Sequence, residues 1–136
     1  MRDVSREISD QAFIAQFENL TLDPVYFDHV GHLRLTWLYL NQYTLDVSIQ
    51  KVCEGINVYA THLGAPDKFH VTITQAMVCL VAARMQPQER SWQYFLANNQ
   101  DIVENALSVL CRDYTKERLL SEEARHVWLE PDLGRS

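Results

Sequence analysis

Apolar residues recur with the spacing of an α-helix along nearly the whole chain, and this periodicity constrains the fold more than any other feature. They fall three and four residues apart, as on one face of a helix, and no clean run alternates apolar and polar residues as a half-buried strand does. Only four Gly and four Pro interrupt the pattern. The sequence therefore predicts an all-α fold.

Capping residues and helix breakers divide this pattern into about six main helices. Ser9, Asp28 and Thr44 are suited to cap the free N–H groups of a first turn, and Gly64 followed by Pro66 ends a helix. The segment "AMVCLVAARM" is apolar almost all round, which is typical of a central, enclosed helix. The predicted helices cover residues 9–19, 28 to 41–43, 45–63, 72–85, a stretch opening at 91, and 101–110, followed by short pieces at 115–120 and 121–128.

Length and composition suit one domain with one hydrophobic core. The chain has 136 residues, of which 47% are hydrophobic. We expect residues 1–136 to form a single-domain helical bundle. Residues 1–8 and 129–136 are predicted tails, the second of them held by Trp128 and Leu133.

The bulk properties also limit the environment and the partners. No stretch approaches the roughly 18 consecutive apolar residues of a membrane span, and "MRDVSREISD" lacks the apolar core of a signal peptide. We therefore expect a cytoplasmic protein without a membrane partner. The formal net charge is -6 and Lys and Arg form no stripe, so nucleic acid is not an expected partner. Cys53, Cys79 and Cys111 lie in apolar runs, as buried free thiols of a reducing compartment do.

The stretch "FDHVGHLRLTWLYLNQY" places two histidines one helical step apart. On a wheel of about 100° per residue, Arg34, Asn41 and Gln42 mark the solvent side. The opposite arc contains His29, His32, Leu33, Thr36, Trp37, Tyr39, Leu40 and Tyr43. We therefore expect both imidazoles on the buried face, where an unpaired polar group costs about 1–3 kcal/mol. Hydrogen bonds to carbonyls could satisfy them, and so could a shared metal ion.

A third histidine favours the metal. His70 precedes the predicted helix 72–85, and three antiparallel helices joined by short loops would bring His29, His32 and His70 to one end of the bundle. Three imidazole ligands leave one coordination position for water or substrate, as in catalytic zinc sites. Imidazole also binds iron, copper and nickel, so the pattern predicts a divalent metal without choosing among these four.

Other polar residues could support such a site. Asp28 could orient an imidazole from the outer shell or simply cap its helix. Thr36, Tyr39 and Tyr43 continue the histidine stripe and could line a pocket beneath the metal, or could be core residues whose hydroxyls meet a carbonyl. His62 falls on a polar side and is exposed, or else serves as a fourth ligand or an outer-shell group. We expect His126 at the surface.

Three segments together resemble a family of small, poorly characterised all-α bacterial proteins. They are "HVGHLRLTWLYL", "GAPDKFHVTIT" and "YTKERLLSEEARHVWLEPDL", and the likeness covers residues 26–133. The family has a His-x-x-His-Leu-Arg-Leu helix, a Gly-x-Pro-x-Lys-aromatic-His loop and a Glu-Pro-Asp-Leu tail. The resemblance implies that His29, His32 and His70 are motif positions. Phe69 stands where that family more often has Tyr, and the resemblance implies no particular activity.

Three functions are compatible with these features. The first is a small metalloenzyme, hydrolytic or redox, in which the three histidines hold one ion that acts on a small molecule. The second is a metal-free small-molecule binder or general acid–base enzyme that uses the same histidines. The third is a helical interaction or regulatory module with histidines in its core.

Overall fold

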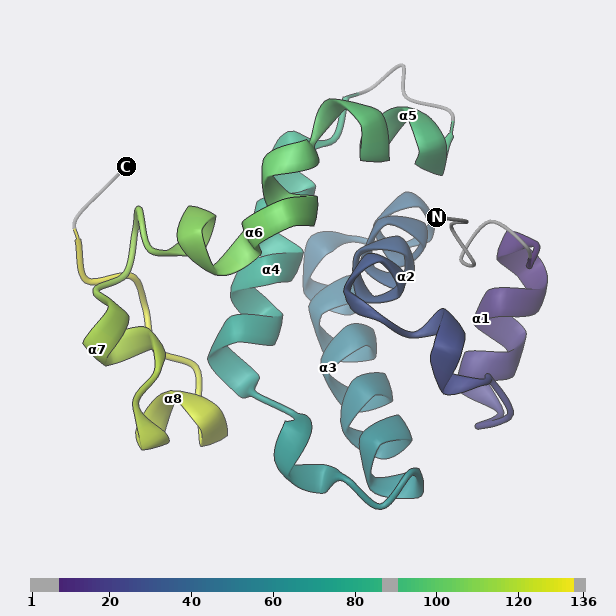
Figure 1. Ribbon diagram of the computed structural model, residues 1–136, viewed down its shortest axis with the longest axis horizontal. Helices are drawn as coiled ribbons and strands as arrows, with labels where there is room; N and C mark the ends of the chain where they lie inside the picture. The colour runs from purple at the N-terminus through teal and green to yellow at the C-terminus, as the bar shows by residue number, and fades with distance from the viewer. Residues whose placement is uncertain (1–7, 87–90, 134–136) are drawn as a thin grey trace.

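The computed structural model describes residues 8–86 and 91–133, which form α-helices and short 3-10 turns without any strand (Figure 1). The all-α prediction is confirmed. Within these ranges there are eight α-helices, six of them of seven residues or more, as the division into main helices and short pieces predicts. In chain order the elements are α1 (Asp10–Glu18), η2 (Pro24–Tyr26), α2 (His29–Gln42), α3 (Leu45–His62), η3 (Pro66–Lys68), α4 (Val71–Arg84), α5 (Trp92–Asn98), α6 (Gln100–Leu110), α7 (Lys116–Leu119) and α8 (Glu122–His126).

Most helices begin where a polar side chain caps the first turn. Six of these side chains accept a backbone N–H three residues ahead, and they are Ser9, Asp28, Thr44, Ser91, Thr115 and Ser121. Helix α4 begins one residue earlier than predicted and is capped by the ring of His70. The sequence therefore fixes where most helices start through local hydrogen bonds.

The core lies where α2, α3 and α4 meet at the centre of the molecule (Figure 1). Helix α4 contacts α2, α3, α6 and α8, which confirms its predicted central place. Helix α1 packs against α3 from one side, while α5 and α6 contact α2. Trp37 is buried, as predicted, and its ring lies 6.1 Å from that of Trp92. The tilted pair joins α2 to α5.

Arg34 corrects the predicted orientation of α2. The helical wheel placed it on the solvent side, but only 3% of the residue is exposed. Its guanidinium group donates to Asp10 at 2.7 Å and to the carbonyl oxygen of Ile8 at 2.7 Å, and it lies over the ring of Phe13 at 4.8 Å. A buried charge is tolerated when it is paired and hydrogen-bonded, and α1 together with Ile8 just before it supplies these partners.

The C-terminal part forms a second, smaller core against α4. Its buried members are Ala76, Leu110, Tyr114 and Leu119, with Trp128 packed at the edge. The predicted tail is fastened as far as residue 133, mainly through its backbone. Leu133 donates its N–H to the carbonyl of Asp113, although its side chain is exposed.

Side-chain bonds complete the attachment of this segment. Asp132 accepts from the backbone and hydroxyl of Thr115 at 2.7 Å each, and the Tyr114 hydroxyl donates to the Leu129 carbonyl. The predicted anchoring by Trp128 is therefore accompanied by polar contacts. The rest of the predicted tails, residues 1–7 and 134–136, lies outside the described ranges.

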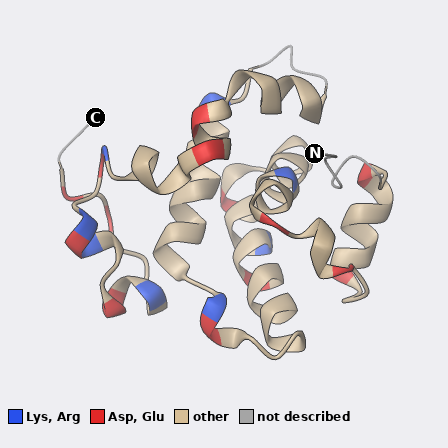
Figure 2. Cartoon of the chain, viewed as in Figure 1, with Lys and Arg blue, Asp and Glu red and all other residues tan. Residues whose placement is uncertain are grey.

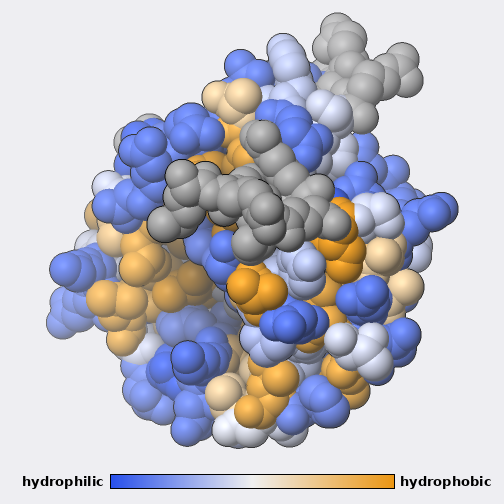
Figure 3. All heavy atoms as spheres, turned by 45° about the vertical axis from the view of Figure 1, so that its right-hand side comes forward, coloured by the Kyte–Doolittle hydropathy of each residue, from blue (hydrophilic) through white to orange (hydrophobic). Residues whose placement is uncertain are grey.

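The surface mixes charged and apolar groups. Acidic and basic residues alternate over the described helices without a basic stripe (Figure 2). Apolar side chains gather around a hollow on the left of the face in Figure 3. Over residues 8–86 and 91–133, no helix combines the length and apolar character needed to cross a bilayer. The three cysteines are free and half-buried, so their predicted burial is confirmed in part.

Candidate functional site

The first turn of α2 is fixed by its own sequence. The Oδ1 atom of Asp28 accepts from the N–H of Gly31 at 2.8 Å, so this residue caps the helix. Gly31 is required here because a Cβ atom would collide with the carbonyl oxygen of Tyr26. The turn η2 therefore lies directly against α2, and Phe27, which follows it, lies beside His32.

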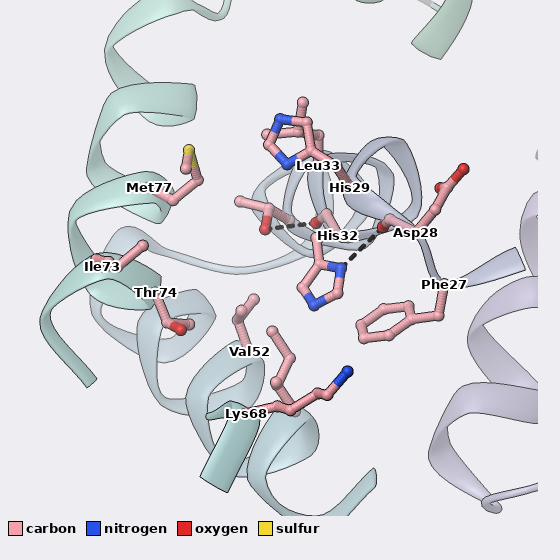
Figure 4. A pocket seen from close by; sticks show the side chains of 12 residues that line it. Phe27, Asp28, His29, His32, Leu33, Val52, Lys68, Ile73, Thr74 and Met77 are labelled. Atoms are coloured by element: carbon pink, nitrogen blue, oxygen red, sulfur yellow. Dashed lines mark hydrogen bonds between the residues drawn. The ribbon is translucent and has the colours of Figure 1, made fainter. Parts of the chain in front are cut away.

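His32 has a defined tautomer. Its Nδ1 lies 2.8 Å from the carbonyl oxygen of Asp28, which can only accept, so Nδ1 carries the proton and donates. The neutral ring therefore has its lone pair on Nε2. The ring stacks on Phe27 with centroids 4.0 Å apart, and Figure 4 shows Nε2 on the side away from Asp28. Burial lowers the pKa of His32 and the neighbouring His29 lowers it further, while the Asp28 carbonyl opposes the shift. The structure thus favours a neutral ring that can accept a hydrogen bond.

His29 does not lie on the buried face, and that prediction is wrong. The residue is exposed, although its Nε2 donates to the carbonyl oxygen of Ile102 in α6 at 2.9 Å. Helix α6 kinks at Asn105, whose Oδ1 caps the next turn by accepting from Ser108 at 3.1 Å. In a regular helix the Ile102 carbonyl would accept the N–H of Ala106, four residues ahead. The kink lies between these two residues. His29 supplies a donor to that carbonyl.

His70 acts as the cap of α4. Its Nδ1 accepts the N–H of Ile73 at 3.1 Å, so the proton of the neutral ring lies on Nε2. That Nε2 atom is buried and makes no hydrogen bond of normal geometry. Burial and the charge of Arg125 lower the pKa of His70, and the nearby Leu119 carbonyl opposes them. The unprotonated nitrogen of this ring is therefore already occupied by the helix.

The three predicted metal ligands line one lobe of a cleft but do not present free nitrogens together. His29, His32 and His70 all border a lobe of about 470 Å³. One ring nitrogen of each is engaged with backbone groups, and among the described residues no three His, Cys, Asp or Glu side chains are placed to hold a metal ion. Metal binding by these residues stays a prediction.

A cleft with two lobes lies beside the histidines. The second lobe, of about 460 Å³, shares His29, His32, Ile56, Lys68, Ile73, Thr74 and Met77 with the first, so the two lobes adjoin. The second lobe has mainly apolar walls, which come from Phe27, Leu33, Val52, Ile56, Ile73 and Met77 (Figure 4). Helices α2, α3 and α4 form its sides, and Lys68 of η3 lies at its mouth.

Thr36 lines the cleft, as predicted, but its hydroxyl already donates to the His32 carbonyl at 2.9 Å. Tyr39 and Tyr43 do not line it, so the pocket alternative is wrong for both, whereas Tyr39 is buried in the core as the other alternative predicts. Tyr39 lies seven residues beyond His32, about 10 Å along a helix, and its hydroxyl donates to Glu18 at 2.6 Å. Tyr43 is exposed and lies beneath the ammonium group of Lys51.

The remaining histidines are at the surface. His62 ends α3 and is exposed, and it borders neither lobe. His126 is exposed, as predicted, and pairs with Glu122 at 2.9 Å.

Sequence reasoning missed the residues that face the histidines. Lys68 in η3 and Thr74 on α4 border both lobes. The available signal was a lysine placed in a short Pro-initiated turn just before His70, at the same end of the bundle. Comparison with protein-family models, curated proteins and solved structures finds no match for this chain.

Proposed function

We propose that this chain binds a small, largely apolar molecule in the cleft between α2, α3 and α4, and that His32 orients this molecule through Nε2. The observation that carries the proposal is the His32 ring itself. The Nδ1 atom of this ring donates to the Asp28 carbonyl and the ring face stacks on Phe27, so Nε2 is left as an unpartnered acceptor on a mainly apolar wall.

The dimensions and lining of the cleft support this proposal. Small-molecule sites are typically concave cavities of about 300–1,000 Å³ with apolar walls and a few fixed polar groups. Each lobe falls in that range, at about 460 and 470 Å³. A ligand could bury its apolar body against Ile56, Ile73 and Met77 while a polar group meets His32.

A dye-binding measurement tests the proposal. Nile red is neutral and apolar, and its fluorescence rises when it leaves water for an apolar cavity. We expect saturable binding to the wild type and strongly weakened binding to Thr74→Phe, because Thr74 is half-buried and borders both lobes. Thr61→Phe is the matched control, since Thr61 is exposed on α3 and borders neither. Equal binding by both variants would contradict the proposal.

A three-histidine metal site is the second candidate, because His29, His32 and His70 border one lobe. Ligation would require His70 to give up its cap on Ile73, since the Nδ1 lone pair is used there. Elemental analysis for zinc, iron, copper and nickel on protein without a histidine tag tests this candidate. It predicts stoichiometric metal in the wild type and loss of most of it in each of His29→Ala, His32→Ala and His70→Ala. Full metal retention in all three variants would contradict it.

A further inference from the structure

Lys68 places a positive charge at the mouth of the cleft. It ends η3, and its amine is directed toward His32 and Phe27 in Figure 4. Within residues 8–86 and 91–133 this ammonium group makes no ion pair or hydrogen bond. The backbone of η3, in contrast, is hydrogen-bonded by a side chain from another helix. Arg125 on α8 donates to the carbonyl oxygen of Asp67 at 2.5 Å. The side chain of Lys68 is therefore available to a ligand.

His32 and Lys68 offer complementary groups to the same region of the cleft. The Nε2 lone pair of His32 accepts a hydrogen bond, and the Lys68 ammonium can only donate one. From this pairing we infer that the cleft selects a weakly acidic hydroxyl compound, such as a phenol. The hydroxyl donates to His32 Nε2, and its oxygen accepts from Lys68. This inference rests on the proposed function of the cleft.

A hydroxyl group fits these partners better than a carboxylate does. A carboxylate has no proton to donate and would place its lone pairs against the Nε2 lone pair of His32 in an apolar surrounding. Protonation of His32 would remove that repulsion, but burial disfavours the charged ring. A hydroxyl satisfies both partners without placing a full charge in the cleft, and the nearby ammonium group stabilises the partial negative charge on its oxygen.

The apolar lining favours an aromatic body for the ligand. Phe27 stacks on His32 and also lines this lobe, so an aromatic ring is part of the surface that the ligand would meet. Met77 offers a thioether on the opposite wall, and sulfur atoms make favourable contacts with aromatic rings. Ile56 and Ile73 add to this apolar surface.

Three naphthalenes of nearly equal size test the inference. Calorimetric titration near neutral pH should compare β-naphthol, its methyl ether and β-naphthoate. The methyl ether can still accept from Lys68 but has no proton for His32. We expect β-naphthol to bind about tenfold more tightly than the ether, as one hydrogen bond of normal strength implies. We expect β-naphthoate to bind more weakly than β-naphthol.

Three variants assign this preference to its residues. His32→Phe keeps a ring against Phe27 but removes the acceptor, so the preference for β-naphthol over the ether should fall to about twofold or less, the range left without that bond. Lys68→Met changes an exposed residue and should weaken β-naphthol by about threefold or more. His62→Phe replaces an exposed histidine outside the cleft and should leave all three affinities unchanged. On the wild type, nitrogen NMR of the imidazoles should show a shift of the His32 Nε2 signal when β-naphthol binds, so the test does not depend on the folding of a variant.

The outcomes distinguish a failure of the proposed ligand class from a failure of ligand binding in the cleft. Equal affinities of the wild type for β-naphthol and the ether would overturn the hydroxyl preference. The same holds if β-naphthoate binds most tightly or if His32→Phe retains the full preference. In each of these cases binding in the cleft still stands. If neither Nile red nor any naphthalene binds, the cleft-binding proposal fails and the inference fails with it.

Discussion

At the scale of single residues, the three histidines of the cleft differ in which nitrogen their neighbours occupy. His29 donates to the Ile102 carbonyl of α6, and His70 accepts an N–H at the start of α4. His32 donates through Nδ1 and keeps the Nε2 lone pair free. The same side chain therefore has three roles: the lone pair of His70 is used by the helix, whereas His29 keeps a lone pair on Nδ1 and His32 keeps one on Nε2.

The lowered pKa of His32 predicts a pH dependence of stability. The ordinary pKa of 6.5 applies to the unfolded chain, and burial makes the folded value lower. As the pH falls below 6.5, the unfolded state therefore takes up a proton that the folded state resists, and the free energy of unfolding decreases. The decrease ends once the pH is below the folded value.

Urea unfolding of the wild type and of His32→Phe, above and below pH 6.5, measures this contribution. The variant lacks the titrating group, so it should lose less stability than the wild type on acidification. The lowered pKa of His70 acts in both proteins and cancels in the comparison. Parallel losses in the two proteins would show that His32 is not held neutral by the fold.

Trp37 tests the orientation of α2. The residue is 5% exposed and packs against Trp92. Trp37→Ala should reduce the free energy of unfolding by about 3–5 kcal/mol, as large-to-small core substitutions do. Chemical denaturation followed by circular dichroism measures the change. A loss below about 1 kcal/mol, typical of a surface position, would mean that this face of α2 is not in the core.

At the scale of elements, ion pairs and kinks decide how helices meet. Arg84 at the end of α4 donates to both carboxylate oxygens of Asp101 at 3.0 and 2.8 Å, and also to Asn99 at 3.0 Å. We call the paired hydrogen bonds from Arg84 to Asp101 the fork, and they fix the start of α6 against the end of α4. Asn105 has non-helical backbone angles within α6, three residues beyond Ile102, whose carbonyl accepts from His29. The position of His29 thus depends on two features of α6.

Asp101→Asn tests the fork. The hydrogen bond from Arg84 lowers the pKa of Asp101 from 3.8 to about 2. Its stabilisation is therefore fully present above pH 3.8 and is lost as the pH falls toward 2. Because Asp101 is 41% exposed, we expect a cost of only about 1 kcal/mol near neutral pH. Urea unfolding measures it, and the effect of Asp101→Asn should largely disappear in an Arg84→Met background. An undiminished effect in that background would assign the loss to another contact.

Local signals were enough to predict the elements. Ser9, Asp28 and Thr44 cap their helices as the sequence predicts, because capping joins residues three apart. The helical wheel failed for Arg34, since it assigns a charge to solvent and cannot see Asp10 on another helix. The helical wheel also failed for His29, because it cannot take account of a partner on another helix. That partner, the Ile102 carbonyl, is 73 residues away in the sequence.

At the scale of the whole molecule, the cleft is built from parts that are distant in the sequence. The helices α2, α3 and α4 form its walls, and the turn η3 brings Lys68 to its mouth. Helix α8 holds that turn through Arg125, and α8 in turn rests on α4. The sequence predicted that His29, His32 and His70 lie at the same end of the bundle, and the three residues do border one lobe. It could not indicate the ring orientations or the place of Lys68, since these depend on contacts between helices.

Methyl NMR during titration with Nile red tests the cleft most directly. We predict that the methyl signals of Ile56, Ile73 and Met77, which line the cleft, shift and saturate together as the dye binds. The signals of Ile14 on α1 and Met85 at the end of α4 should stay in place, since neither residue borders the cleft. Saturating shifts at Ile14 or Met85 without shifts at the cleft methyls, or no shift anywhere, would contradict the account.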